Sequence, residues 1–163
     1  MRWSFWWPSC ITKPAGKFSM LRQFLVGGGV SLANFTIHAL VMTTVVGVAR
    51  VAGAKKISHP SLFLIVVMIP TVSVLMITHA VEVIVWSLAY WTVEAAPPGA
   101  NLTDFAFVNY TTLGYGDVLP TQDWRLLGPI TAMNGVLLFG WSTAIIFEVL
   151  RRALARIGDL SSD

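Results

Sequence analysis

Seven consecutive residues, Thr-Thr-Leu-Gly-Tyr-Gly-Asp at positions 111–117, combine closely spaced glycines with oxygen-bearing side chains. Gly114 and Gly116 lie two residues apart, and glycine reaches positive φ at little steric cost. A backbone that alternates between ordinary and positive φ turns consecutive carbonyls toward one side. Such a row of carbonyls, together with the Thr112 hydroxyl, replaces the water shell of a dehydrated cation. The segment therefore predicts cation binding by main-chain oxygens.

The residues around this segment form long apolar runs. The chain has 163 residues, of which 55% are hydrophobic and only 12% charged, and its mean hydropathy is +0.70. A soluble domain carries about twice that share of charged residues. Uncharged or nearly uncharged runs at 24–49, 61–93 and 128–150 are each long enough to cross a bilayer as a helix. We expect an all-α membrane protein with three transmembrane helices.

The segment resembles the selectivity filter of potassium channels, whose pattern is Thr-X-Gly-Tyr-Gly-Asp. The matching residues are Thr112, Gly114, Tyr115, Gly116 and Asp117. Leu113 stands where the family most often has Val, a mild departure because this position contributes mainly its carbonyl. The resemblance extends over residues 61–156 and is to small bacterial potassium channels that carry an extra N-terminal helix. It implies that K⁺ binds to oxygens of residues 112–115, as the permeant ion and not as a cofactor.

The same resemblance implies the architecture of the pore. The expected parts are an outer helix at 61–93, a re-entrant pore helix at 104–111, a filter at 112–117 and an inner helix at 128–150. One filter per chain implies a homotetramer around a central pore. The location implied is the cell membrane, plasma or inner, crossed several times by each chain.

Several side chains are expected to support the filter. They are Thr111, Asn109, Glu82, His79 and Trp124. Thr103 or Asp104 is expected to cap the pore helix, since both residue types are good N-caps.

One position departs from the pattern of some potassium channels. Val108 stands where those channels have a glutamate that pairs with the filter aspartate. Asp117 then needs another partner, and Asn109, Tyr110 or Trp124 are the candidates.

His79 and Glu82 share one face of the second apolar run, deep in the membrane. A charged side chain at such depth costs about 2.5–3.5 kcal/mol on insertion scales, so it should face protein or water. Two interpretations stay open. Either Glu82 braces the back of the pore loop, or it is a neutral residue that hydrogen-bonds to His79 or Asn34 for helix packing. Opening by pH through these residues or His38 is one hypothesis for gating.

Other polar and small residues invite similar pairs of interpretations. Asn34 and His38 lie four residues apart on one helix face, and we expect them to hydrogen-bond to another helix. Gly135 stands at the family's usual hinge position, with Gly140 five residues on. Both are candidate gating hinges, and the alternative is that they are packing glycines, which are common in membrane helices.

Residues 1–23 hold four basic residues among tryptophans, and we interpret them as an interfacial tail or a start assigned too early. A pore loop that opens outward puts Arg50, Lys55 and Lys56 on the cytoplasmic side, together with Arg151, Arg152 and Arg156. The N-terminus then lies outside, where its basic residues oppose the usual charge rule.

Other functions are less consistent with the sequence. The net charge of +3 lies in short clusters beside apolar runs, which does not suggest nucleic-acid binding. No nucleophile motif or zinc-ligand spacing accompanies His79 and Glu82, so we expect no enzyme. The alternatives are a non-selective cation channel and a non-conducting membrane subunit.

Overall fold

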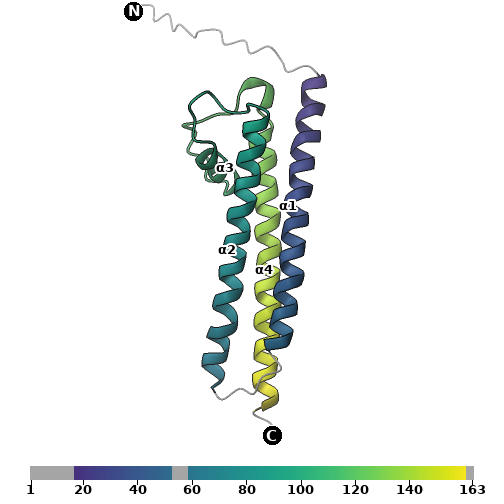
Figure 1. The fold of residues 1–163 in the computed structure, drawn as a ribbon, viewed down its shortest axis with the longest axis vertical. Helices are drawn as coiled ribbons and strands as arrows, with labels where there is room; N and C mark the ends of the chain where they lie inside the picture. Colours follow the sequence, from purple (N-terminus) through teal and green to yellow (C-terminus); the bar gives the residue numbers. More distant parts are fainter. Residues whose placement is uncertain (1–16, 53–58, 161–163) are drawn as a thin grey trace, which may run out of the picture.

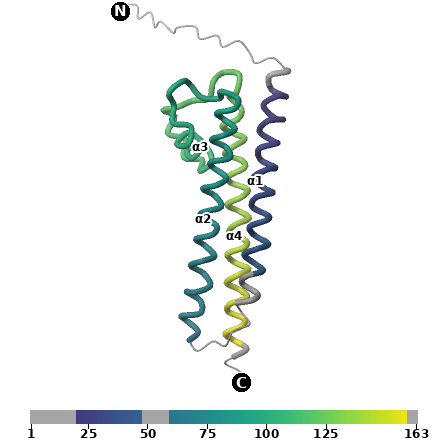
Figure 2. Tube along the Cα trace, viewed as in Figure 1, coloured from purple at the N-terminus to yellow at the C-terminus, as the bar shows by residue number. Residues whose placement is uncertain are grey.

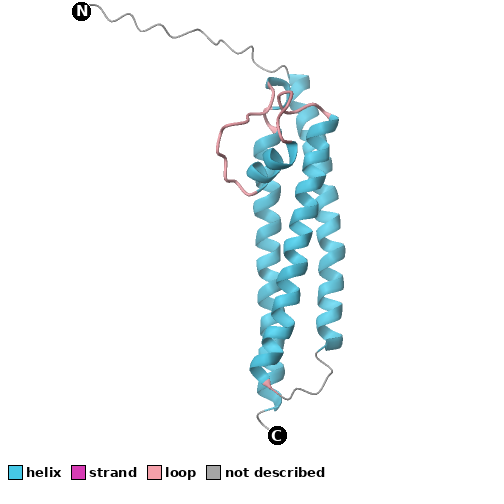
Figure 3. Cartoon of the chain, turned by 60° about the vertical axis from the view of Figure 1, so that its left-hand side comes forward, coloured by secondary structure: helices cyan, strands magenta, loops and turns pink. Residues whose placement is uncertain are grey.

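The computed structural model describes residues 17–52 and 59–160, which fold into helices without any strand in those ranges. The elements are α1 (Lys17–Ala52), α2 (Pro60–Thr92), α3 (Leu102–Tyr110), the short 3-10 helix η1 (Gln122–Trp124) and α4 (Leu127–Leu160). The long helices α1, α2 and α4 run side by side, and the short α3 packs against α2 and α4 near one end of the bundle (Figure 1, Figure 2). The loops between α2 and α4 gather at that same end (Figure 3).

Three helices are long and apolar enough to cross a membrane. Their candidate spans are Met20–Gly47, Pro60–Thr92 and Gln122–Gly158. The predicted all-α membrane protein with three spanning helices is therefore confirmed. Part of the tail at 1–23 and part of the basic loop between α1 and α2 lie outside the described residues.

Two helices are longer than the apolar runs that predicted them. α1 begins at Lys17 and not at residue 24, and α4 continues to Leu160 instead of ending at 150. At the end of the apolar run of α4, Glu148 pairs with Arg151 at 2.9 Å and with Arg152 at 2.5 Å. Such pairs at spacings of three and four residues support helix outside the bilayer. Hydropathy marks where a helix enters lipid and does not mark where its hydrogen bonding stops.

The apolar core lies where α2, α3 and α4 meet. Trp86, Tyr90 and Tyr110 are almost completely buried there, with Leu127 and Leu138 from α4. Aromatic rings make much of this contact: Tyr90 and Phe105 lie 4.9 Å apart between ring centroids, within the range of favourable ring pairs. The core thus fixes α3 against both α2 and α4.

α1 makes polar contacts with the segment just before α4. The Leu126 N–H donates to Gln23 Oε1 at 2.7 Å. The Arg22 guanidinium lies 4.3 Å from the centroid of the Trp124 ring, a cation–π geometry. Gly27 lets the helices approach, since a Cβ there would come within 2.9 Å of the Ile130 side chain.

A second close approach lies between α4 and the end of α3. A Cβ on Gly135 would lie 2.0 Å from the Tyr110 carbonyl oxygen, which no side chain tolerates. The structure therefore supports the interpretation of Gly135 as a packing glycine. Its role as a gating hinge stays a prediction. A Cβ on Gly140 would meet no atom within 4 Å outside its own stretch of helix, among the described residues.

We expect Gly135→Ala to destabilise the protein by about 1–3 kcal/mol, because α4 and α3 must separate to admit the methyl group. The measurement is the free energy of unfolding of purified protein by SDS in mixed micelles. Gly28→Ala is the matched control, since nothing lies within 4 Å of its Cβ position. Equal effects of the two substitutions would contradict the close contact at Tyr110.

Candidate functional site

The short helix α3 is capped by a residue that we did not predict. Asn101 Oδ1 accepts hydrogen bonds from the N–H groups of Thr103 and Asp104, each at 3.2 Å. The prediction of Thr103 or Asp104 as the cap is wrong, because α3 begins at Leu102 and both residues already lie in its first turn. Asp104 still helps there, since a carboxylate favours the positive end of the helix dipole.

The other end of α3 closes with a tight hydrogen-bonded turn. The Leu113 N–H donates to Val108 O at 3.0 Å and the Thr112 N–H donates to Asn109 O at 3.1 Å. This pair of bonds is a Schellman motif, which requires positive φ at Thr112. Thr112 has φ of 61°, and a β-branched residue adopts this conformation at a cost of about 1–3 kcal/mol. The turn therefore sets the direction in which the next residues leave α3.

Positive φ recurs at every second residue after α3. Thr112, Gly114 and Gly116 have φ values of 61°, 57° and 81°. The sequence predicts positive φ at both glycines. It does not predict positive φ at Thr112, because a β-branched residue rarely adopts that conformation. Leu113 and Tyr115 are 55% and 71% exposed, so the described residues leave these side chains of the loop largely uncovered.

Two of the side chains expected to support the loop, Thr111 and Asn109, bond back to carbonyls of α3. Thr111 Oγ1 donates to Phe107 O at 2.8 Å, and Asn109 Nδ2 donates to Phe105 O at 2.9 Å. Tyr110 donates its hydroxyl proton to Glu82. Of the three candidate partners of Asp117, Asn109 and Tyr110 thus direct their side-chain donors elsewhere.

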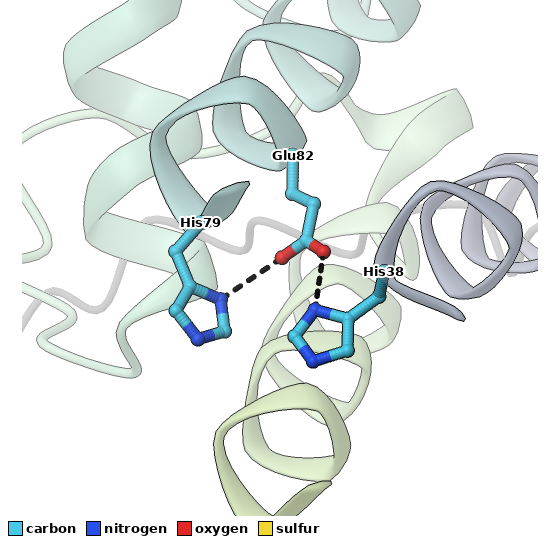
Figure 4. A group of neighbouring side chains, drawn as sticks. All are labelled: His38, His79 and Glu82. Atoms are coloured by element: carbon cyan, nitrogen blue, oxygen red, sulfur yellow. Dashed lines mark hydrogen bonds and ion pairs between the residues drawn. The ribbon is translucent and has the colours of Figure 1, made fainter. Parts of the chain in front are cut away.

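Behind the end of α3 lies a buried polar cluster (Figure 4). Both imidazoles turn Nδ1 toward the Glu82 carboxylate: His38 Nδ1 lies 2.8 Å from Oε1, and His79 Nδ1 lies 2.9 Å from Oε2. The Tyr110 hydroxyl donates to Oε2 at 2.5 Å. Glu82 and His38 are completely buried. The carboxyl group therefore faces protein, and it contacts the last residue of α3 directly.

The cluster continues toward α1 and α4. Asn34 Nδ2 donates to Glu82 O and to Asn134 Oδ1, both at 3.2 Å, and Trp86 Nε1 donates to Asn134 Oδ1 at 2.9 Å. The expected hydrogen bonds of Asn34 and His38 to another helix are confirmed. The sequence did not identify Asn134 or Tyr110 as partners of these residues.

His38, His79 and Glu82 are also residue types that bind metal ions, and one ligand atom from each lies within 4.8 Å of the others. Zinc with bonds of about 2.0–2.1 Å holds tetrahedral ligands about 3.3 Å apart. The N···O separations of 2.8 and 2.9 Å are instead those of hydrogen bonds. The arrangement therefore fits shared protons better than a zinc ion.

The fold and this site define a membrane protein with a short helix and a glycine-containing loop held between two spanning helices. Residues 62–152, more than half of the chain, match the family model described as ion channel. The chain belongs to this ion channel family, as a small pore-loop channel. The match covers most of α2, α3, the loop and most of α4, but not α1. Comparison with curated proteins and with solved structures gives no match.

We expect Tyr110→Phe to destabilise the protein by about 1.5–3 kcal/mol, since it removes a hydrogen bond to a buried carboxyl group. Tyr90→Phe is the matched control, because the Tyr90 hydroxyl lies 2.6 Å from the neutral Thr131 hydroxyl and its loss should cost about 0.5–1.5 kcal/mol. Unfolding in SDS mixed micelles measures both. An equal or larger effect at Tyr90 would contradict a special role for the Glu82 contact.

Proposed function

We propose that four copies of this chain assemble around a central pore lined by residues 112–117, and that the pore conducts K⁺ selectively and passively. The observation that carries the proposal is the positive φ at Thr112, Gly114 and Gly116. Alternation of this kind turns successive carbonyls to one side of the strand, where four chains present rings of oxygens. The rings come from Thr112, Leu113, Gly114 and Tyr115, and Gly116 and Asp117 complete the outer end.

In this proposal ions lose their water at the carbonyl rings and advance by displacing one another between adjacent sites. The C-terminal end of α3 carries the partial negative charge of its dipole, which favours a cation nearby. No cofactor is needed, because the coordinating groups are backbone oxygens and the permeant ion supplies the charge.

The surface of α4 supports assembly into a tetramer. One face of α4 is buried within the chain through Thr131, Asn134, Leu138 and Ser142. The opposite face exposes Met133, Val136, Leu137 and Phe147, each more than half exposed, with Gly140 between them. A stripe at this helical spacing suits contact with neighbouring copies or the pore. The exposed loop residues need the same neighbours, since irregular backbone at membrane depth must be buried or line water.

The proposed orientation follows from the charges at the end of α4. Arg151, Arg152 and Arg156 are exposed there, at the end opposite to α3 (Figure 1). Clustered arginines favour the cytoplasmic side, which places the loop and the start of α1 on the outer side of the cell membrane.

We expect liposomes that contain the purified protein to pass K⁺ at least tenfold faster than Na⁺, and Ba²⁺ to block the flux. Gly114→Ala should abolish K⁺ flux, because alanine is strained at a φ of 57° and the carbonyl rings lose their alignment. Gly99→Ala is the matched control, since Gly99 also has positive φ, 83°, but lies outside the loop.

Other outcomes of the flux measurement distinguish the alternatives. Equal K⁺ and Na⁺ flux would overturn selectivity and identify a non-selective cation channel. Absence of flux from correctly folded tetramers would identify a non-conducting subunit, and an assembly other than a tetramer would exclude the fourfold pore.

A further inference from the structure

Four side chains in the buried cluster form a closed ring of hydrogen-bonding contacts. Glu82 joins the Nδ1 atoms of His38 and His79 at 2.8 and 2.9 Å. On the far side of both imidazoles, Ser142 Oγ lies 2.9 Å from His79 Nε2 and 3.3 Å from His38 Nε2. The ring therefore joins α1, α2 and α4 through a carboxyl group, two imidazoles and one hydroxyl.

Counting donors and acceptors fixes the number of protons that this ring can hold. A hydrogen bond needs one proton between its two heavy atoms, so four contacts need four protons. The ring closes when Glu82 donates to His38, His38 Nε2 donates to Ser142, Ser142 donates to His79, and His79 Nδ1 donates back to Glu82. In this state every member is neutral. Moving the carboxyl proton onto His38 Nδ1 gives an ion pair with the same four protons, so both forms carry zero net charge.

Rings with other proton counts are worse in a buried place. With three protons the cluster carries a net charge of −1, and one contact lacks a donor. With five protons it carries +1, and two N–H or O–H groups face each other across one contact. A net charge buried away from water costs several kcal/mol unless it is compensated. Among the described residues, the other titratable group that contacts the ring is Tyr110 of α3. Its hydroxyl donates to Glu82 Oε2 from outside the ring, and its oxygen also lies 2.9 Å from His79 Nδ1, where it can share the proton that His79 donates to Glu82. α4 contributes only Ser142.

This ring lies directly behind the proposed filter. Tyr110 is the last residue of α3, and its carbonyl packs on Gly135 while its hydroxyl bonds to the ring. The position of the Glu82 carboxyl group thus sets the position of the residue from which the loop begins. His38 reaches the same carboxyl group from α1, which lies outside the residues matched to the ion channel family.

We propose that His38, Glu82, His79 and Ser142 form a four-proton hydrogen-bonded ring with no net charge, and that this ring positions the end of the pore helix through Tyr110. His38, His79, Glu82 and Ser142 are then positioning residues for the pore, and α1 is part of the support of the filter. Only the consequence for flux rests on the proposed potassium pore; the ring itself does not.

The number of protons in the ring can be measured by comparison with Glu82→Gln. The amide donates to His38 and accepts from His79 and Tyr110, so the variant closes the same ring without a carboxyl proton. The two proteins share all other titrating groups, whose contributions cancel. Above about pH 5 the Glu82 carboxyl group of the unfolded chain is ionised. If the folded ring holds four protons, the wild type therefore takes up one proton on folding that the variant does not.

Stability linked to an extra proton in the folded state falls as the pH rises. We expect the ratio of the wild-type to the Glu82→Gln folding constant to fall about tenfold for each pH unit above about pH 5, until the ring gives up its proton. SDS unfolding of the full-length proteins at equal concentration measures both constants. A ratio that stays flat with pH means that the folded wild type holds three protons, and this overturns the proposal.

Two further comparisons test closure and position. Ser142→Ala opens the ring and should lower the folding constant at least ten times more than Ser31→Ala does. The buried Ser31 hydroxyl has no hydrogen-bond partner among the described residues. Glu82→Leu, which removes the acceptor of Tyr110, should lower stability and, if the pore conducts, K⁺ flux more than Glu82→Gln. Equal effects within either pair overturn the proposal.

A bound metal ion is the competing explanation of the cluster. Unfolding of the wild type is therefore repeated with Zn²⁺ and with EDTA. The proton ring predicts no stabilisation by Zn²⁺, and stabilisation that His38→Asn abolishes would overturn it in favour of an ion site. These stability measurements stand whether or not the liposomes pass K⁺, so failure of the ring and failure of the proposed function are distinguishable.

Discussion

A carboxyl group placed deep in a membrane protein must find hydrogen-bond partners inside the protein, and this requirement organises the fold around Glu82. The side chain is completely buried, where an unpaired charge would be costly. Its direct partners are His38 on α1, His79 on α2 and Tyr110 on α3. Ser142 on α4 joins the same cluster through the imidazoles. Satisfying one acidic group thus fixes how four helices meet.

The end of α3 presents a related requirement. The last carbonyls of a helix have no partner within it, and at this place the donors are the N–H groups of Thr112 and Leu113. The first residues of the loop are therefore held by the helix that precedes them. Because residue 135 is a glycine, α4 packs directly against the Tyr110 carbonyl at the start of the same turn. A residue in a strained conformation, Thr112, persists because hydrogen bonds and packing determine its position from two sides.

The sequence predicts the features that depend on local pattern. Apolar runs locate three spanning helices, residue spacing locates the loop, and the three-residue separation of His79 and Glu82 predicts their shared face. The sequence does not identify Tyr110, Ser142 or Asn134 as partners, because these contacts join helices whose rotation about their axes no local pattern fixes. The N-cap of α3 was misassigned for a different reason: Asn101, Thr103 and Asp104 are all good caps, and only the first hydrogen-bonded turn distinguishes them.

α1 lies outside the part of the chain that matches the family model, yet it supplies hydrogen-bond partners to that part. The family match begins after α1, yet α1 supplies His38 and Asn34 to Glu82 and Gln23 to the start of α4. Lipid tails offer no hydrogen bonds, so without α1 the Glu82 carboxyl group would lose His38 as a partner and the Glu82 main-chain carbonyl would lose Asn34. Glu82 and His38 are therefore a matched pair across two helices: a chain that keeps one needs the other, and loss of both is easier to accommodate than loss of either alone.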